Sequence, residues 1–246
     1  MTASTPAPLV AARDLTLGAA GRTLLRGLDW RAERGERWCI VGRNAAGKST
    51  LLRALAGLPV PQRTGSVAWL GRAQSAWSAP DAAAVRAFAP QHAADRFSIP
   101  VQRLLELAVC AADAPAPATL LAALDAGDLA QRDVLQLSGG ERQRVALAQC
   151  AAQGAPLLLL DEPVSFQDPA HQLQVGRWLA SLRGHCVVFS AHDINWTAAV
   201  ATHVLALYGD GRWEAGPAQR MLDAARLQAI YGCAWRQADG AWLSVD

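Results

Sequence analysis

The chain has 246 residues and a formal charge of +2, and 52% of its residues are apolar while 18% are charged. These values indicate a globular protein with a sizeable core and exclude a disordered chain, and the small net charge gives no sign of a nucleic-acid partner. No uninterrupted apolar run reaches the ~18 residues of a transmembrane helix, and residues 1–8 lack the features of a secretory signal. Five cysteines without C-x-x-C spacing are typical of a reducing compartment, which predicts a cytoplasmic protein.

Short apolar segments alternate along the chain with longer stretches of 3.6-residue periodicity, which predict strands and helices respectively. In chain order we predict strands at 9–12 and 38–41, a helix at 49–58, a strand at 67–70, helices at 101–112, 118–124 and 141–152, a strand at 157–160, a helix at 169–182, and strands at 187–190 and 204–207. This alternation favours an α/β fold with a mostly parallel sheet. Near the end of the chain, Asp239-Gly240 predicts a two-residue hairpin turn.

The middle of the chain differs from the rest because it carries predicted helices and no convincing strand. We therefore predict a helical subdomain at residues 91–155, inserted into an α/β core formed by residues 1–90 and 156–246. Prolines at positions 80, 90 and 100 interrupt the approach to this subdomain.

A glycine-rich loop lies between the predicted strand 38–41 and the predicted helix 49–58. It matches the pattern G-x-x-x-x-G-K-[ST] in the strand–loop–helix setting that this pattern requires. Such a loop points backbone N–H groups at the phosphates of a nucleotide. Lys48, the only lysine among 23 basic residues, would reach the β- and γ-phosphates, and the Ser49 hydroxyl would bind Mg²⁺. The predicted nucleotide-binding residues are Gly42, Asn44, Ala45, Ala46, Gly47, Lys48, Ser49 and Thr50. A glycine turn with a solvated lysine is the structural alternative.

Two adjacent carboxylates, Asp161 and Glu162, follow the apolar segment 157–160. A buried strand that delivers two carboxylates at its end suits a metal–nucleotide site. Asp161 would hold hydrated Mg²⁺, and Glu162 would orient or deprotonate the attacking water. An ordinary acidic turn after a strand is the alternative.

A third motif, Ser138-Gly139-Gly140-Glu141, opens the predicted helix 141–152. Ser138 is a suitable helix N-cap, the glycines permit close backbone approach, and the helix dipole would face an anion. The spacing of Ser138 and Glu141 also fits an ordinary capping box.

In this order and spacing, the motifs resemble those of the ATP-binding subunit of an ABC transporter, and the likeness covers essentially the whole chain. Residues 137–143 resemble the LSGGQ-type signature of that family. The resemblance implies a P-loop nucleotide hydrolase core with an N-terminal antiparallel β portion, and ATP and Mg²⁺ as cofactors. It also implies that Gln91 in the Q-loop contacts Mg²⁺, that Asp168 is the D-loop aspartate, and that His192 lies at the γ-phosphate. The implied catalytic residues are therefore Glu162, His192 and Gln91, and the implied metal ligands are Ser49, Gln91 and Asp161.

The chain departs from the family pattern at three places. Ala45 stands where the family usually has glycine, and Leu17 lies near the position of an aromatic residue that stacks on adenine. If Ala45 has a positive φ, we expect strain there, and together with the missing ring this predicts weak binding of free nucleotide. Phe166-Gln167 is unusual for the D-loop.

The resemblance also implies partners. Two copies would pair head to tail in the presence of ATP, so that the signature Ser138–Glu141 of one copy acts on the nucleotide held by the other. A separate transmembrane permease would dock near residues 91–101 and hold the chain on the cytoplasmic face of the inner membrane, with a periplasmic substrate-binding protein in the same system. Residues 97–101, 191–195 and 226–232 resemble importers of corrinoids, haem and iron–siderophore chelates, and the short tail after Tyr231 most resembles the vitamin B12 branch.

Two other functions stay open at this point. A soluble ABC-type ATPase of DNA repair or translation would use the same site, although such proteins usually carry coiled-coil inserts, zinc cysteines or two fused ATPase domains. A P-loop kinase would lack the segment 137–143 and would need a pocket for a second substrate. The sequence contains the segment 137–143 and shows no coiled-coil insert, zinc cysteines or second ATPase domain, which favours the transporter subunit.

Overall fold

The protein is described by a computed structural model that covers residues 7–91, 97–111 and 114–245. Its centre is a six-stranded sheet with the order β10-β9-β3-β8-β7-β6. The strands from β9 to β6 are parallel, and β10 pairs antiparallel with β9 at one edge. The strands are β3 (Arg37–Val41), β6 (Arg86–Ala89), β7 (Leu157–Leu160), β8 (Cys186–Ser190), β9 (His203–Leu207) and β10 (Trp213–Pro217).

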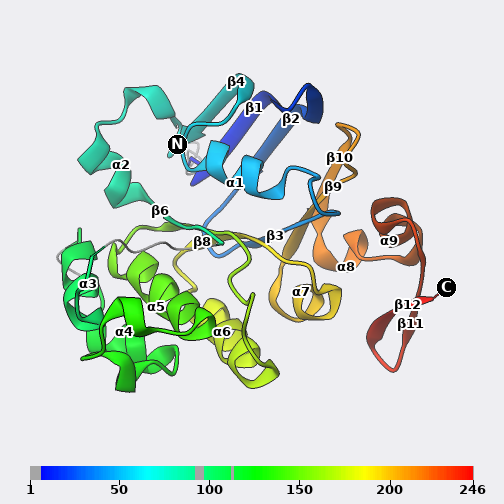
Figure 1. Ribbon diagram of the computed structural model, residues 1–246. Coiled ribbons are helices and arrows are strands. Elements are labelled where there is room, and N and C mark those ends of the chain that lie inside the picture. The colour runs from blue at the N-terminus through cyan, green and yellow to red at the C-terminus, as the bar shows by residue number, and fades with distance from the viewer. Residues whose placement is uncertain (1–6, 92–96, 112–113, 246) are drawn as a thin grey trace, which may run out of the picture.

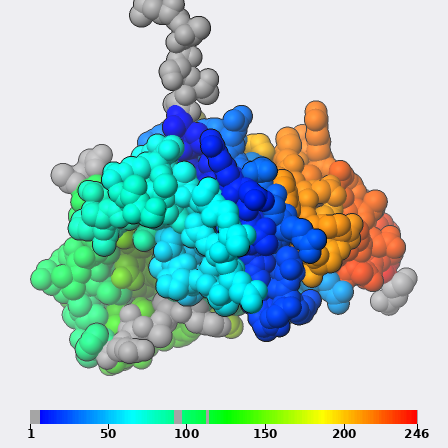
Figure 2. All heavy atoms as spheres, turned by 90° about the horizontal axis from the view of Figure 1, so that it is seen from above, coloured from blue at the N-terminus to red at the C-terminus, as the bar shows by residue number. Residues whose placement is uncertain are grey.

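A second, antiparallel sheet has the order β2-β1-β4-β5. Its strands are β1 (Val10–Ala19), β2 (Arg22–Ala32), β4 (Gln62–Trp69) and β5 (Arg72–Ala73). Helix α1 (Lys48–Leu55) lies between the two sheets, and Leu51, Leu52 and Leu55 are fully buried there (Figure 1). The expected antiparallel portion at the N-terminal side is therefore present. Figure 2 views the molecule from the side of this antiparallel sheet, and the N-terminal third of the chain, coloured blue to cyan, covers the centre of that surface.

The parallel sheet is buried on both faces, which explains why its strands are continuously apolar. Successive side chains of a strand point to opposite faces. In β3, Trp38 and Ile40 belong to the core shared with α1, whereas Cys39 and Val41 belong to the core on the other face. The four leucines of β7 divide between the two cores in the same alternating way.

The remaining helices are α2 (Ala79–Val85), α3 (Val101–Ala108), α4 (Pro117–Ala123), α5 (Gly139–Ala152), α6 (Pro169–Ser181), α7 (Ile194–Val200), α8 (Ala218–Met221) and α9 (Ala224–Tyr231). Helices α3 to α6 lie on the side of the parallel sheet opposite α1 (Figure 1). Helices α3, α4 and α5 pack on one another through buried side chains such as Leu105, Leu121 and Val145. The boundaries of the helical subdomain at residues 91 and 155 stay a prediction.

Most predicted elements are present, with shifted ends. The predicted helix 101–112 ends at Ala108, and residue 112 lies outside the described part of the chain. Strands β2, β5, β6 and β10 and helices α2, α7, α8 and α9 were not predicted from the sequence. The predicted hairpin is confirmed: Asp239 and Gly240 have φ of 50° and 78° and join β11 (Ala234–Ala238) to β12 (Ala241–Val245).

Candidate functional site

The glycine-rich loop connects β3 to α1 and needs its glycines for steric reasons. A Cβ atom on Gly42 would lie 2.8 Å from the carbonyl oxygen of Leu207. Gly47 has a φ of 104°, which side chains disfavour, and a Cβ atom there would lie 3.0 Å from the Cβ of Leu24. The loop can therefore approach β9 and β2 closely only with glycine at these two positions.

Lys48 begins α1 and reaches back under the loop. Its Nζ donates hydrogen bonds to the carbonyl oxygens of Gly42 (2.9 Å) and Arg43 (3.2 Å). Burial lowers the pKa of Lys48, while the carboxylates of Glu162 and Asp161 act in the opposite direction. A partly desolvated ammonium group at the wall of this cavity is well suited to bind phosphate.

Asp161 and Glu162 directly follow β7 and have different surroundings. Asp161 is 5% exposed and accepts a hydrogen bond from the Ser190 hydroxyl at 2.7 Å. Glu162 has a left-handed backbone with φ 50° and lines the cavity described below, whereas Asp161 does not. Three donors surround that carboxylate: Gln91 Nε2 (2.7 Å), Ser165 Oγ (2.8 Å) and His192 Nε2 (2.7 Å).

The structure thus brings together Gln91, Glu162 and His192, which follow the adjacent parallel strands β6, β7 and β8. They line one cavity of about 570 Å³ together with the glycine-rich loop. The lining residues are Ala19, Ala20, Arg22, Leu24, Asn44, Ala45, Gly47, Lys48, Ser49, Thr50, Gln91, Glu162 and His192. A site at the carboxyl ends of parallel strands is the usual ligand position in such sheets.

Two loop residues that were predicted to bind nucleotide, Gly42 and Ala46, do not line the cavity. Gly42 is buried behind the loop, and its carbonyl oxygen accepts from Lys48. Ala46 is 2% exposed, packs in the core with α1, and donates its backbone N–H to the carbonyl oxygen of Arg43 at 3.1 Å. Both residues shape the loop without lining the cavity.

The oxygen atoms at and beside the cavity are suitable ligands for a magnesium ion. Ser49 and Gln91 line the cavity, and Asp161 is buried next to the cavity residue Glu162; they offer hydroxyl, amide and carboxylate oxygens, and Mg²⁺ prefers oxygen ligands. Among the described residues there is no cluster of three or more histidine, cysteine or acidic side chains that would hold a metal alone. This combination suits an ion held by one or two protein oxygens, water and the phosphates of a nucleotide.

Ser138 and Glu141 form a complete capping box at the start of α5. Ser138 N donates to Glu141 Oε2 (2.7 Å), and Glu141 N donates to Ser138 Oγ (3.4 Å). The Ser138 backbone N–H is the main reason that the pKa of Glu141 is lowered. A Cβ atom on Gly140 would lie 2.9 Å from the carbonyl oxygen of Phe166, so the signature and the D-loop touch within one chain. The signature residues do not line the nucleotide cavity of their own chain.

Asp168 is the N-cap of α6 and is engaged locally. Its Oδ1 accepts from the backbone N–H of His171 at 3.0 Å, and its Oδ2 lies 2.9 Å from His171 Nδ1. The other ring nitrogen of His171 lies 3.4 Å from Asp125 Oδ2 in the loop after α4. The role of Asp168 toward a second copy stays a prediction.

The expectation for Leu17 is wrong. This side chain is 1% exposed and packs in the core between the two sheets, because the alternation of β1 turns it inward. The cavity wall on this side is formed by Ala19, Ala20 and Arg22 of the β1–β2 turn. Ala45, in contrast, lines the cavity and has the anticipated positive φ, at 61°.

Sequence reasoning also missed two hydroxyls. Ser165 donates to the Glu162 carboxylate, and Ser190 contacts both Asp161 and the backbone of Glu162. A signal for Ser190 exists in the sequence, because a hydroxyl ends an otherwise apolar strand two residues before His192.

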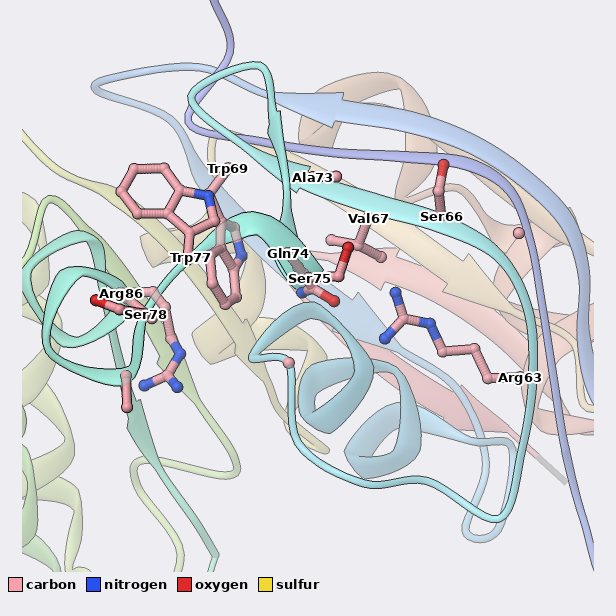
Figure 3. Close-up of a pocket in the computed structure, with 14 residues that line it drawn as sticks. Arg63, Ser66, Val67, Trp69, Ala73, Gln74, Ser75, Trp77, Ser78 and Arg86 are labelled. Atoms are coloured by element: carbon pink, nitrogen blue, oxygen red, sulfur yellow. The ribbon is translucent and has the colours of Figure 1, made fainter.

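A second cavity, of about 600 Å³, lies between β4 and α2 (Figure 3). Arg63 and Arg86 stand on opposite sides of it, with Gln74 and Ser75 between them. None of its lining residues belongs to the motifs described above, so it is separate from the nucleotide cavity.

Comparison with known proteins agrees with this geometry. Residues 25–165 match the family described as ABC transporter. The hemin import ATP-binding protein HmuV of Roseobacter denitrificans is 40% identical over 241 residues, which cover 92% of this chain and 91% of that protein. HmuV of Streptomyces coelicolor is also 40% identical, over 91% of this chain and 83% of that protein. The chain belongs to the ABC transporter family.

Membership of this family makes the chain an ATP-hydrolysing, ATP-binding subunit with Mg²⁺ as the partner ion. The fold agrees with a solved chain of a metal-chelate type ABC transporter in an inward-facing conformation, with a TM-score of 0.77, 24% identity and 96% coverage of both chains. The ATP-bound structure of a bacterial Atm1-family ABC exporter has the same TM-score at 23% identity, over 92% of this chain and 42% of that one. No helix in the described ranges is long and apolar enough to cross a membrane.

Proposed function

We propose that this chain is the ATPase of a membrane importer whose cargo is haem or a related iron chelate. The observation that carries the proposal is the convergence of Lys48, Gln91, Glu162 and His192 on one cavity. The cargo is supported by relatives at 40% identity that are named for hemin import. Those names favour the haem branch over the vitamin B12 branch, and they give no support to a soluble ATPase acting on nucleic acid.

The geometry supports a division of work in hydrolysis. Lys48 and the loop N–H groups bind the phosphates, and the Ser49 hydroxyl and Asp161 would hold Mg²⁺, which neutralises phosphate charge. Glu162 accepts a proton from the water that attacks the γ-phosphorus, and the bond to the β–γ bridging oxygen breaks. Gln91 and His192 hold the Glu162 carboxylate from two sides at 2.7 Å, which fixes the base before substrate arrives.

The site of one chain is incomplete, which supports an ATP-dependent dimer. Ser138–Glu141 of the same chain does not line the cavity that contains Lys48 and Glu162. In a head-to-tail pair, the capped start of α5 in one copy would cover the phosphates bound to the other. Closure then couples the free energy of ATP binding to movement of a partner.

The partner that moves would be a separate permease, and a cavity of about 480 Å³ beside β6 supports its position. Phe88 and Pro90 form one wall of this cavity, and Leu107 of α3 and Ala146 of α5 form the other. It therefore lies between the sheet and the helical region, next to Gln91. Of the predicted docking stretch 91–101, residues 92–96 lie outside the described residues. Docking there would place the chain on the cytoplasmic face of the inner membrane, in a system with a periplasmic binding protein.

Growth on a defined iron source tests the cargo. A strain that lacks this chain should fail to grow with hemin as the sole iron source and should grow normally with ferrous salt. The wild-type gene should restore growth, and a Lys48→Ala gene should not, because the variant lacks the phosphate-binding cation. Unimpaired growth on hemin, or a specific defect in the use of vitamin B12, would contradict the proposed cargo.

A further inference from the structure

Ser190 ends β8 and connects the two acidic residues of the site. Its side chain is fully buried, and it carries the only hydroxyl in a strand whose other residues are cysteine, valine and phenylalanine. The hydroxyl donates to Asp161 Oδ1 at 2.7 Å and accepts from the backbone N–H of Glu162 at 2.9 Å. A buried hydroxyl is unfavourable unless it is hydrogen-bonded, and here both of its partners belong to the ATP site.

The first contact orients the Asp161 carboxylate. A hydrogen bond of 2.7 Å from a hydroxyl to a carboxylate is charge-assisted and directional. Because Oδ1 is engaged with Ser190, Oδ2 is the oxygen left to face a cation, and no hydrogen bond to Oδ2 is present among the described residues. Without the hydroxyl, the carboxylate would be free to rotate between several orientations.

The second contact holds the backbone of Glu162. This residue has φ 50° in the left-handed region, a conformation that persists only when its surroundings fix it. Ser190 accepts its N–H, and Gln143 Nε2 lies 3.4 Å from its carbonyl oxygen. His192 follows Ser190 by two residues and contacts the same glutamate, so one strand end fixes both the backbone and the side chain of Glu162.

We propose that Ser190 is a positioning residue that presents Asp161 to Mg²⁺ and Glu162 to the attacking water. Ser190 does not line the nucleotide cavity itself and acts through the two acidic residues. This inference rests on the proposed nucleotide site. It predicts that loss of the hydroxyl weakens the magnesium-dependent part of ATP binding and leaves magnesium-free binding unchanged.

The test compares Ser190→Ala, Ser190→Thr and Thr197→Val in titrations with ATP, in EDTA and at increasing MgCl₂. Thr197→Val is the matched control, because the Thr197 hydroxyl is also buried and donates to the carbonyl oxygen of Asp193 at 2.8 Å. Ser190→Ala should raise the Mg²⁺ concentration for half-maximal ATP binding three- to tenfold, with the affinity in EDTA within twofold of wild type. Ser190→Thr keeps the hydroxyl and should restore the wild-type value, and Thr197→Val should leave it unchanged.

A double-mutant cycle separates positioning from general loss of stability. In an Asp161→Asn background, Ser190→Ala should cause no further change in magnesium dependence, because its target is already absent. The inference is overturned if Ser190→Ala and Thr197→Val lose the same stability in urea and show the same wild-type magnesium dependence. It is also overturned if the effects of Ser190→Ala and Asp161→Asn are additive. Failure of the wild-type chain to bind ATP at all would overturn the proposed function, and the inference with it.

Discussion

Ala45 holds a left-handed backbone in the phosphate-binding loop, and Ala45→Gly should relieve the strain. The left-handed region costs a residue with a Cβ atom about 1–2 kcal/mol, and the φ of Ala45 is 61°. The substitution would remove this strain, but about 0.4–1 kcal/mol is offset because glycine has more conformational freedom than alanine in the unfolded chain. The expected net effect is a rise of about 0.5–1 kcal/mol in the free energy of unfolding, which corresponds to about 1–4 °C in Tm for a chain of this size.

The affinity for ATP should not change together with the stability of Ala45→Gly. A loop that keeps this φ when nucleotide binds carries the same strain before and after binding, so, contrary to the expectation from the sequence, the strain cancels in the affinity. We therefore expect the Kd for Mg-ATP of Ala45→Gly to stay within twofold of wild type. Leu17→Tyr should not tighten binding either, because its ring would enter the core between the sheets and cost about 1–3 kcal/mol of stability.

Urea unfolding and calorimetric titration with Mg-ATP measure the two quantities separately. Ala20→Gly is a matched control, since Ala20 has φ 49° in the β1–β2 turn and should show the same gain in stability. A loss of 1 kcal/mol or more in Ala45→Gly would refute the strain argument. A tenfold change in its ATP affinity would show that the loop changes conformation when nucleotide binds.

Three further results are expected. An amine-selective reagent should label Lys48 as the only side-chain amine, and Mg-ATP should protect it; equal labelling with and without nucleotide would count against its role. Burial lowers the pKa of Lys48, so between that lowered pKa and the ordinary lysine value of about 10.4 the unfolded chain binds more protons than the folded chain. In this pH window the midpoint of urea unfolding should rise with pH, while the affinity for ATP, measured by fluorescence, should fall as Lys48 loses its charge. Ser138→Ala should leave ATP binding by the monomer intact and make ATPase activity low and independent of protein concentration; loss of monomer binding would mean that the signature acts on its own chain.

The sequence was sufficient to predict the elements with the strongest patterns. The segment 157–160 coincides with β7, because a strand buried on both faces is continuously apolar. Strand β2 was missed although residues 28–32 alternate between buried and exposed, since Arg26 and Gly27 obscure the first half of the pattern. Helix α2 was missed because it is short, although Ser78 caps it and Pro80 lies in its first turn.

The motifs of the site were predictable, and their mutual geometry was not. Gln91, Glu162 and His192 meet because β6, β7 and β8 are neighbours in the sheet, and the order of strands cannot be read from one sequence. The error at Leu17 has the same origin, because the residue is close to the cavity in sequence but faces the core in β1. Contacts such as those of Ser190 with Asp161 depend on strand register and appear only in three dimensions.

Single-turnover hydrolysis by Glu162→Gln tests the assignment of the catalytic base most directly. The amide keeps the shape of the side chain and loses the ability to accept a proton, and removal of a positioned base lowers the rate by about 10²–10⁴-fold. We expect the purified variant to bind Mg-ATP with wild-type affinity, to hydrolyse it at this reduced rate, and to elute as a dimer when ATP is present. Hydrolysis at a rate close to that of the wild type would contradict the assignment of Glu162 as the base.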